Sequence, residues 1–406
     1  MNTDETGTVK TDPRRGTVSA QAALLLGAFI LAWLTSCAPP DPPEDSGTFE
    51  RLDANPILKP GFAAYPGGPT VDSVSDPDVL FDENLGLWRM WFAVSYFEPA
   101  GDFFTGIMHA ESADGFSWDV TPGLALAHAA DSSAWDYTST ETPSVVIDAG
   151  ADPAERYRLY YSGGNIQTSA LGDYPRFQIG GAVSADGYTF TRIAAADSPY
   201  GVEGLVLRVE DSLPAYAGRA TTGVVADPEA RIGNGSYELW FTVIGLDSQD
   251  RDVAGGIGFA TSPNGTSFTA YSGNPLDSVK RFEEDFTAQP SVLRRDDGTY
   301  ELWYNADLPD ELDRRDIGPN GTIGFWRATG PSATGPAPPS VRAFAYHPND
   351  PLEERGFSVG ADVVRRNGVT RLYYGSLADT EAVTFPDNPF GFTYILSVAM
   401  DSGGSR

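Results

Sequence analysis

One short aromatic motif occurs five times in this chain, and it restricts the fold more than any other feature. The copies are Trp88-Arg89-Met90-Trp91-Phe92, Tyr157-Arg158-Leu159-Tyr160-Tyr161, Tyr237-Glu238-Leu239-Trp240-Phe241, Tyr300-Glu301-Leu302-Trp303-Tyr304 and Thr370-Arg371-Leu372-Tyr373-Tyr374. Aromatic, Leu and Met side chains fill most positions, which is typical of a largely buried strand. Because repetition at intervals of tens of residues indicates a repeat architecture, each copy predicts one structural unit.

Each motif is accompanied by further strand-like segments. A second apolar run precedes every copy, and turn pairs such as Asn234-Gly235, Asp297-Gly298 and Asn367-Gly368 favour a hairpin between the two. A third strand, a turn and a short fourth strand follow several copies. Four antiparallel strands in each of five successive units predict an all-β, five-bladed β-propeller. A β-sandwich and a β-solenoid are the alternatives.

The first 36 residues have the pattern of an export signal. Lys10, Arg14 and Arg15 precede an apolar run, residues 22–34, that is too short for a stable membrane span. The run ends in Leu34-Thr35-Ser36-Cys37, which resembles a bacterial lipobox. This resemblance implies acylation of Cys37 and a protein anchored by lipid in the cell envelope, with the outer membrane favoured by the following Ala. An ordinary secretory signal and a single anchor helix are the alternatives.

Composition bounds the rest of the chain. Residues 37–48 are Pro-rich and predict an extended tether, residues 49–400 the propeller, and residues 401–406 a disordered tail. The single Cys excludes an intramolecular disulfide. With 27 Lys and Arg against 56 Asp and Glu, the formal net charge is −29, and such a surface repels nucleic acid. We expect a monomer that binds no nucleic acid.

The topology of a propeller predicts where a site would lie. The connections between the second and third strands are long in every unit: 95–105, 162–177, 244–254, 305–321 and 376–392. Long loops that converge on one face of a rigid scaffold mark a binding face. The residues expected to ring the mouth of the central channel begin the inner strands: Asp76, Thr142, Thr222, Gln289 and Gly360.

The inner strands also carry a family resemblance. Ser75-Asp76-Pro77-Asp78, with Pro-Ser-Val motifs at later inner strands, resembles the five-bladed glycoside-hydrolase propellers. That group includes arabinanases, β-xylosidases, invertases, levansucrases and mannoside phosphorylases, and the resemblance covers residues from about 50 to 400. It implies an enzyme that acts on an oligo- or polysaccharide. In the arabinanase and xylosidase family an Asp-Pro in blade one supplies the general base, and Asp76 matches it.

Two positions depart from the pattern of that family, in which an Asp of blade two tunes the pKa and a Glu of blade three is the general acid. Blade two has Thr142 with Glu141 beside it, and blade three has Thr222 with no adjacent carboxylate. Glycoside hydrolysis requires two carboxyl groups across the scissile bond, so Glu141 becomes the expected partner of Asp76. Alternation along a strand would turn Glu141 away from Thr142. The other carboxylates considered are Glu98, Glu203, Asp211 and Asp307.

The remaining expected contacts are with substrate. Asp78 and Asp362 share the face of Asp76, and with Thr142, Thr222 and Gln289 they form the expected polar binding set. Trp135 and Tyr137 lie near the mouth-side loops and are expected to stack on sugar rings. The His that often holds a metal in blade four of this family corresponds to Gln289. No catalytic metal or cofactor is therefore expected, although a structural calcium in the channel is compatible with the carboxylates.

Three functions follow from these patterns. The leading hypothesis is an extracytoplasmic, membrane-anchored glycoside hydrolase with Asp76 as general base. The first alternative is a carbohydrate-binding propeller that has lost the general acid. The second alternative is a protein-binding surface propeller, because one fold serves many functions.

Overall fold

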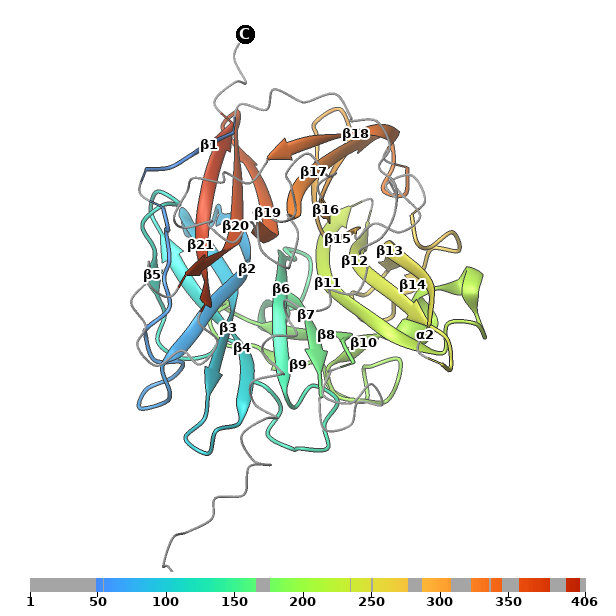
Figure 1. Ribbon diagram of the computed structural model, residues 1–406, viewed down its shortest axis with the longest axis horizontal. Helices are drawn as coiled ribbons and strands as arrows, with labels where there is room; N and C mark the ends of the chain where they lie inside the picture. The colour runs from blue at the N-terminus through green and yellow to red at the C-terminus, as the bar shows by residue number, and fades with distance from the viewer. Residues whose placement is uncertain are drawn as a thin grey trace, which may run out of the picture.

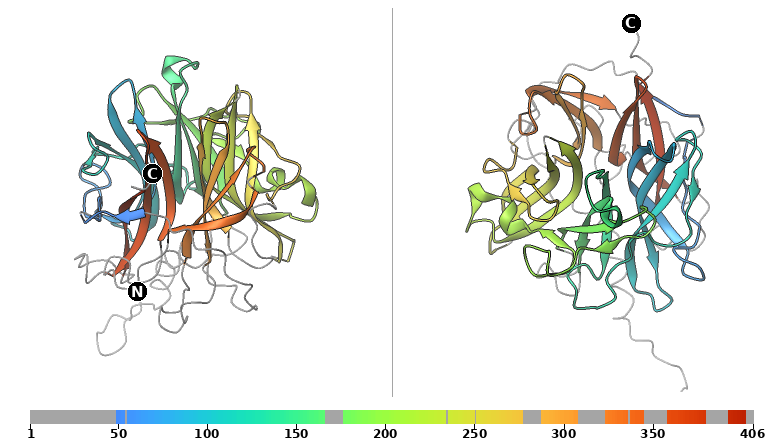
Figure 2. Two further views of the ribbon diagram at one scale, coloured as in Figure 1. Left: turned by 90° about the horizontal axis from the view of Figure 1, so that it is seen from above. Right: turned by 180° about the vertical axis from the view of Figure 1, so that it is seen from behind.

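The structure, a computed structural model, describes residues 49–53, 55–165, 176–233, 235–249, 251–276, 287–307, 323–335, 337–344, 358–379 and 392–401. Five antiparallel sheets follow one another around a central channel, which confirms the predicted propeller (Figure 1). A side view shows their strands running along the direction of the channel (Figure 2). Cys37, the leader and the tether lie outside the described residues. Within the described ranges, no helix is long and apolar enough to cross a membrane.

Every blade is built outward from an inner strand. Blade one consists of β2 (Val71–Asp82), β3 (Leu87–Phe97), β4 (Phe103–Ser112) and β5 (Asp119–Val120). Blade two consists of β6 (Ser139–Ile147), β7 (Tyr157–Gly164), β8 (Gln178–Ser184) and β9 (Thr191–Arg192), with β10 (Leu205–Leu207) also paired to β8. Blade three consists of β11 (Thr222–Gly233), β12 (Ser236–Leu246), β13 (Asp252–Ser262) and β14 (Thr269–Ala270). Blade four consists of β15 (Thr287–Arg294), β16 (Tyr300–Asp307), β17 (Ile323–Gly330) and β18 (Ala337–Phe344).

Blade five combines the two ends of the propeller. It consists of β19 (Ser358–Arg366), β20 (Val369–Asp379), β21 (Phe392–Asp401) and, on the outside, β1 (Phe49–Arg51). β1 pairs antiparallel with β21, and Phe49 lies opposite Asp401. The first strand of the body therefore completes the last blade and closes the ring. Closure of this kind leaves only short strand edges exposed.

The fourth residue of the repeated motif explains why the repeat is aromatic at that position. In four blades its ring donates a hydrogen bond to a backbone carbonyl in the turn between the third and fourth strands of the next blade. These bonds run from Trp91 to Gly187 (2.8 Å), Tyr160 to Gly265 (2.8 Å), Trp240 to Ala333 (2.9 Å) and Tyr373 to Gly115 (3.1 Å). The aromatic residue thus fills the interface between blades and also fixes its neighbour, because a buried polar group needs a partner.

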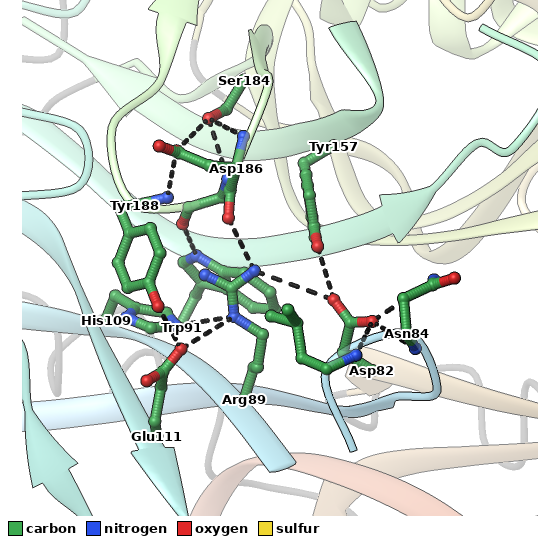
Figure 3. Close-up of polar contacts among 12 residues, drawn as sticks. Asp82, Asn84, Arg89, Trp91, His109, Glu111, Tyr157, Ser184, Asp186 and Tyr188 are labelled. Carbon is green, nitrogen blue, oxygen red and sulfur yellow. Dashed lines mark hydrogen bonds and ion pairs between the residues drawn. The ribbon is translucent and has the colours of Figure 1, made fainter. Parts of the chain in front are cut away.

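The junction of blades one and two adds a buried cation to this pattern (Figure 3). Arg89 is fully buried, and its guanidinium lies over the rings of Trp91, Tyr157 and Tyr188. Its Nε donates to Nε2 of His109 at 3.0 Å. Burial, reinforced by Arg89, lowers the pKa of His109 to about 3, so this imidazole is neutral. His109 is therefore a neutral, structural residue of the interface between blades one and two.

Candidate functional site

Each inner strand is interrupted by a bulge at the same depth in the channel. The pairing with the second strand skips a step there in all five blades. The first residue of each bulge has a positive φ: Asp76 48°, Thr142 48°, Asp227 50°, Gln289 53° and Gly360 58°. Non-Gly residues rarely adopt this conformation, which costs about 1 kcal/mol or more per residue. The bulge turns all five residues to the channel, which they line together. We call these five residues the mouth ring.

The mouth ring differs from the expected one in blade three. Thr222 is the first residue of β11, pairs with Leu246, and lies five positions before the bulge. Asp227 occupies the ring position in its place. The sequence contained the necessary signal, because Asp227-Pro228 repeats the Xaa-Pro step of Asp76-Pro77. The placement of Thr222 in the ring was therefore wrong: the apolar pair Val224-Val225 was aligned with the pairs that follow the bulge in the other blades, but in β11 it precedes the bulge, so the register shifted by five.

The long strands also shorten two of the expected loops. β3 extends to Phe97 and β4 begins at Phe103, so only residues 98–102 connect them. In blade three, residues 247–251 form the connection. Much of the other three connections lies outside the described residues. In blades one and three, the segments expected to be loops are therefore continued sheet.

Hydrogen bonds from the second strands hold the mouth ring in place. The backbone N–H of Asp227 donates to Oγ of Ser162 at 2.8 Å, and that of Gln289 donates to Oγ1 of Thr242 at 2.8 Å. In each pair the acceptor belongs to the preceding blade. The bulge frees these N–H groups from the strand ladder, and the neighbouring side chains satisfy them. The positions of Asp227 and Gln289 are thus each defined by two blades.

Asp76 is held at both of its carboxylate oxygens. Ser75 Oγ donates to Oδ2 at 2.7 Å, and Gln289 Nε2 donates to Oδ1 at 3.3 Å. Gln289 Oε1 accepts the N–H of Gly360 at 3.0 Å, which defines the orientation of the amide. A Cβ on Gly360 would lie 2.3 Å from Oδ1 of Asp76. The empty position in blade five therefore provides the space that Asp76 occupies.

The two ring carboxyl groups have unequal electrostatic environments. Burial raises the pKa of Asp76 to about 6, against the opposing hydrogen bond from Ser75. Burial raises the pKa of Asp227 to about 7; a hydrogen bond with Thr242 opposes this, and the charge of Asp76 adds to it. Near neutral pH, Asp76 is thus the more ionised group and Asp227 the more protonated one. This arrangement suits a general base and a general acid.

Glu141 lies behind the mouth ring. It is buried, with 3% of its surface exposed, and it is not among the residues that line the channel. Its pKa is raised well above the usual value by burial and then by the charges of Asp76 and Asp227. Thr105 of β4 forms a hydrogen bond with it. The predicted alternation therefore applies: Thr142 faces the channel, and Glu141 faces the interface with blade one.

A second ring lies one strand period deeper. Asp78, Ser144, Glu229, Ser291 and Asp362 are all buried, and we call them the inner ring. Each side chain accepts a backbone N–H from the following blade. The bonds are Val145 to Asp78 (3.0 Å), Ala230 to Ser144 (2.9 Å), Val292 to Glu229 (2.9 Å), Val363 to Ser291 (3.0 Å) and Val79 to Asp362 (2.7 Å). The five bonds form a closed circuit that joins all five blades around the channel.

The expected aromatic and loop residues lie elsewhere. Trp135 stacks on Tyr161 with ring centroids 5.9 Å apart, and its Nε1 donates to the carbonyl of Glu203. Tyr137 packs edge-on against Phe104 and His128. Among the other carboxylates considered, Glu98 accepts a hydrogen bond from Tyr65, and Asp211 pairs with Arg208 at the surface. None of these residues is among those that line the channel.

The channel between the two rings is narrow. Its volume is about 40 Å³, which holds very few water molecules and no sugar ring. A glycan could therefore reach only the mouth ring, from the side where Asp227 and Gln289 remain half-buried. The carboxyl groups of Asp76 and Asp227 are presented there from blades one and three.

Fold and site together describe a five-bladed propeller with two carboxyl groups, those of Asp76 and Asp227, at the mouth of its channel. No family model matches the chain, and no curated protein matches it by sequence. Solved structures do match. A glycosyl hydrolase from Bacteroides ovatus is 15% identical with a TM-score of 0.54, covering 87% of this chain and 93% of its own.

Two further neighbours come from the mannoside phosphorylases and their relatives. A β-1,2-mannobiose phosphorylase from Listeria innocua, in complex with β-1,2-mannobiose, has a TM-score of 0.55 at 12% identity, covering 87% of this chain and 96% of its own. A family 130 structure, described with glycoside hydrolases that target β-1,2-mannosidic linkages in Candida mannan, has a TM-score of 0.54 at 15% identity, covering 90% and 96%. The shared feature is the fold, and it is that of the group indicated by the sequence.

Proposed function

We propose that this protein is a glycoside hydrolase in which Asp76 is the general base and Asp227 the general acid. The observation that carries the proposal is the presence of both carboxyl groups in one ring, with the pKa of Asp76 about 6 and that of Asp227 about 7. The sequence pattern had suggested that blade three lacks the acid of the family. Asp227 provides a carboxyl group in that blade, so the reason for favouring a binding protein without the acid is removed.

The neighbouring residues have supporting roles in this proposal. Glu141 does not contact the substrate in this proposal, because it is buried behind the ring and does not line the channel. Thr142 and Gln289 face the channel mouth and are available to sugar hydroxyl groups. Asp78 and Asp362 act in the inner ring, where they hold backbone N–H groups of neighbouring blades.

A panel of oligo- and polysaccharides tests the proposal. Wild-type protein is expected to release sugar from at least one glycan. Asp76→Asn keeps the size of the side chain and removes the base, so it should lower the rate by about 10²–10⁴-fold with the fold intact. Asp211→Asn, at an exposed helical turn, is the matched control and should retain full activity. Binding of a glycan without release of any sugar would replace the proposal with the carbohydrate-binding alternative.

We further propose that an acyl group on Cys37 anchors the enzyme to the cell envelope. The lipobox-like segment that ends at Cys37 supports this proposal. Cys37→Ala should abolish acyl labelling and release the protein from the membrane fraction. Unchanged membrane association of that variant would contradict the anchor.

A further inference from the structure

Three carboxylates of the inner ring come close enough to hold a cation. Oxygens of Asp78, Glu229 and Asp362 lie within 4.8 Å of one another, and all three residues are buried. They belong to blades one, three and five, so each lies on a different sheet. Buried charges of one sign need a positive partner, since removing them from water costs several kcal/mol each.

The chain supplies a positive group of its own. Arg231 lies one strand period below Glu229 on β11. At the same level the other inner strands carry only apolar residues: Leu80, Val146, Leu293 and Val364. The guanidinium of Arg231 is thus the one cationic group that the described inner strands present at this depth.

The contacts of Arg231 are with the same carboxylates. Its Nη2 lies 2.7 Å from Oε1 of Glu229 and 3.8 Å from Oδ1 of Asp362. Its Nε donates to the carbonyl of Val292 in blade four at 2.9 Å. The position of the guanidinium is therefore defined by blades three, four and five. Its side chain is 30% exposed, so the guanidinium is not fully removed from solvent.

These contacts do not fit a bound divalent cation. Ca²⁺ takes six to eight oxygen ligands at about 2.3–2.6 Å. One oxygen of each carboxylate already accepts a backbone N–H, and the Glu229 oxygen that does so also contacts Arg231. A second cation among these groups would lie within a few ångströms of the guanidinium and be repelled by it. These contacts argue against the structural calcium that the sequence pattern allowed for.

We propose that Arg231 is a built-in cation that takes the place of a divalent metal ion in the channel, and that its removal creates a divalent-cation site formed by Asp78, Glu229 and Asp362. The native protein then needs no metal for its stability. The inner ring keeps its circuit of hydrogen bonds because one chain provides both the carboxylates and their counter-ion. This inference does not depend on the proposed hydrolase activity.

The full-length protein is tested with Ca²⁺, Mg²⁺ and Mn²⁺ as probes. For wild type, chelation by EDTA and addition of millimolar Ca²⁺ should both leave Tm unchanged. Arg231→Met keeps the length of the side chain and removes its charge. In EDTA this variant should melt at a lower temperature than wild type, and a divalent ion should restore part of the loss, with saturable binding of one ion per molecule measured by calorimetry.

Two further variants make the result specific. Arg231→Lys restores a positive charge and should show no rescue by metal. If Arg231→Met does not fold, the response of wild-type Tm to EDTA and Ca²⁺ still tests the proposal. Arg208→Met removes an exposed arginine from its pair with Asp211 and controls for nonspecific binding to a very acidic surface. A wild-type protein that binds one Ca²⁺ and loses Tm in EDTA would overturn the proposal. So would an Arg231→Met variant that has wild-type stability in EDTA and does not respond to a divalent ion.

Discussion

Gly360 illustrates how a single residue shapes the channel mouth. Four blades place a side chain in the mouth ring, whereas blade five leaves its position empty beside Oδ1 of Asp76. Gln289 of blade four donates a hydrogen bond to the same oxygen of Asp76. The geometry of the proposed base therefore depends on a residue with no functional group.

Gly360→Ala tests that dependence. An added Cβ would lie 2.3 Å from Oδ1 of Asp76, so the carboxylate must shift and lose its bond from Gln289. We expect activity to fall by at least about tenfold, since small displacements of a catalytic group are costly. Gly298→Ala is the control: its φ is also positive, and its Cβ would meet no atom within 4 Å. Equal activity of both variants would contradict the role of the empty position.

Asp227 also predicts a pH dependence of stability. Its pKa rises from 3.8 to about 7 on folding, so the folded state binds the proton more tightly. The contribution of this group to the unfolding free energy is complete below about pH 4 and is lost as pH rises to about 7. Asp227→Asn removes the titration and should gain at least about 1 kcal/mol relative to wild type at neutral pH, because one pKa unit corresponds to about 1.4 kcal/mol.

Urea unfolding of the two proteins across that pH range measures the difference. Parallel curves for wild type and Asp227→Asn would show that Asp227 is not perturbed by folding.

At the level of residues, the sequence predicted part of the site. Asp76, Thr142, Gln289 and Gly360 lie in the mouth ring as expected, because each stands just before a recognisable apolar pair of the inner strand. Asp227 was missed because the apolar pair Val224-Val225 of β11 precedes the bulge, whereas Val79-Leu80 of β2 follows it. Which oxygens Gln289 and Ser75 would contact depends on side-chain packing between blades far apart in sequence, and no local pattern contains that information.

The inner strand is the element that joins the blades. Its bulge directs one residue to the mouth ring, and the next residue of the same face accepts an N–H from the following blade. The repeated motif of the second strand adds an aromatic donor that bonds to the turn between the third and fourth strands of the next blade. The inner-ring bond thus joins neighbouring blades in all five repeats, and the aromatic bond adds a second connection in four of them.

Ser144→Ala tests the inner-ring circuit. It removes the acceptor of the Ala230 N–H and leaves a buried donor without a partner. We expect the unfolding free energy to fall by about 1–3 kcal/mol, with the same fold by circular dichroism. Ser117→Ala, at an exposed turn, is the control and should stay within about 0.5 kcal/mol of wild type. A loss at Ser144 no larger than that at Ser117 would contradict the circuit.

At the level of the whole molecule, the propeller depends on β1 for closure. β1 occupies the outer edge of blade five, where it pairs with β21. Phe49 of this strand also packs edge-on against Trp303 of blade four, with ring centroids 5.5 Å apart. The contacts of β1 therefore involve both blade five and blade four.

Removal of residues 1–52 should lower Tm and promote self-association through the exposed edge of β21, whereas removal of residues 1–48 should have no effect. Thermal unfolding and size-exclusion chromatography compare the two proteins. Identical behaviour would show that β1 is dispensable for closure.

The five-bladed fold itself was predictable because the repeat appears five times and each copy has the same neighbours. The exchange of β1 into blade five was not, because three residues carry no strand pattern of their own and pair only when the ring closes. The structural neighbours share this fold at 12–15% identity, which shows how few residues the architecture requires.

The pH profile of kcat/KM on a glycan that the enzyme hydrolyses tests the assignment of base and acid most directly. The account predicts a bell-shaped profile with an acidic limb near the pKa of Asp76, about 6, and a basic limb near that of Asp227, about 7. Asp227→Asn should lower the maximum by about 10²–10⁴-fold and remove the basic limb. A basic limb that persists in Asp227→Asn would contradict the account, because another group would then be the acid.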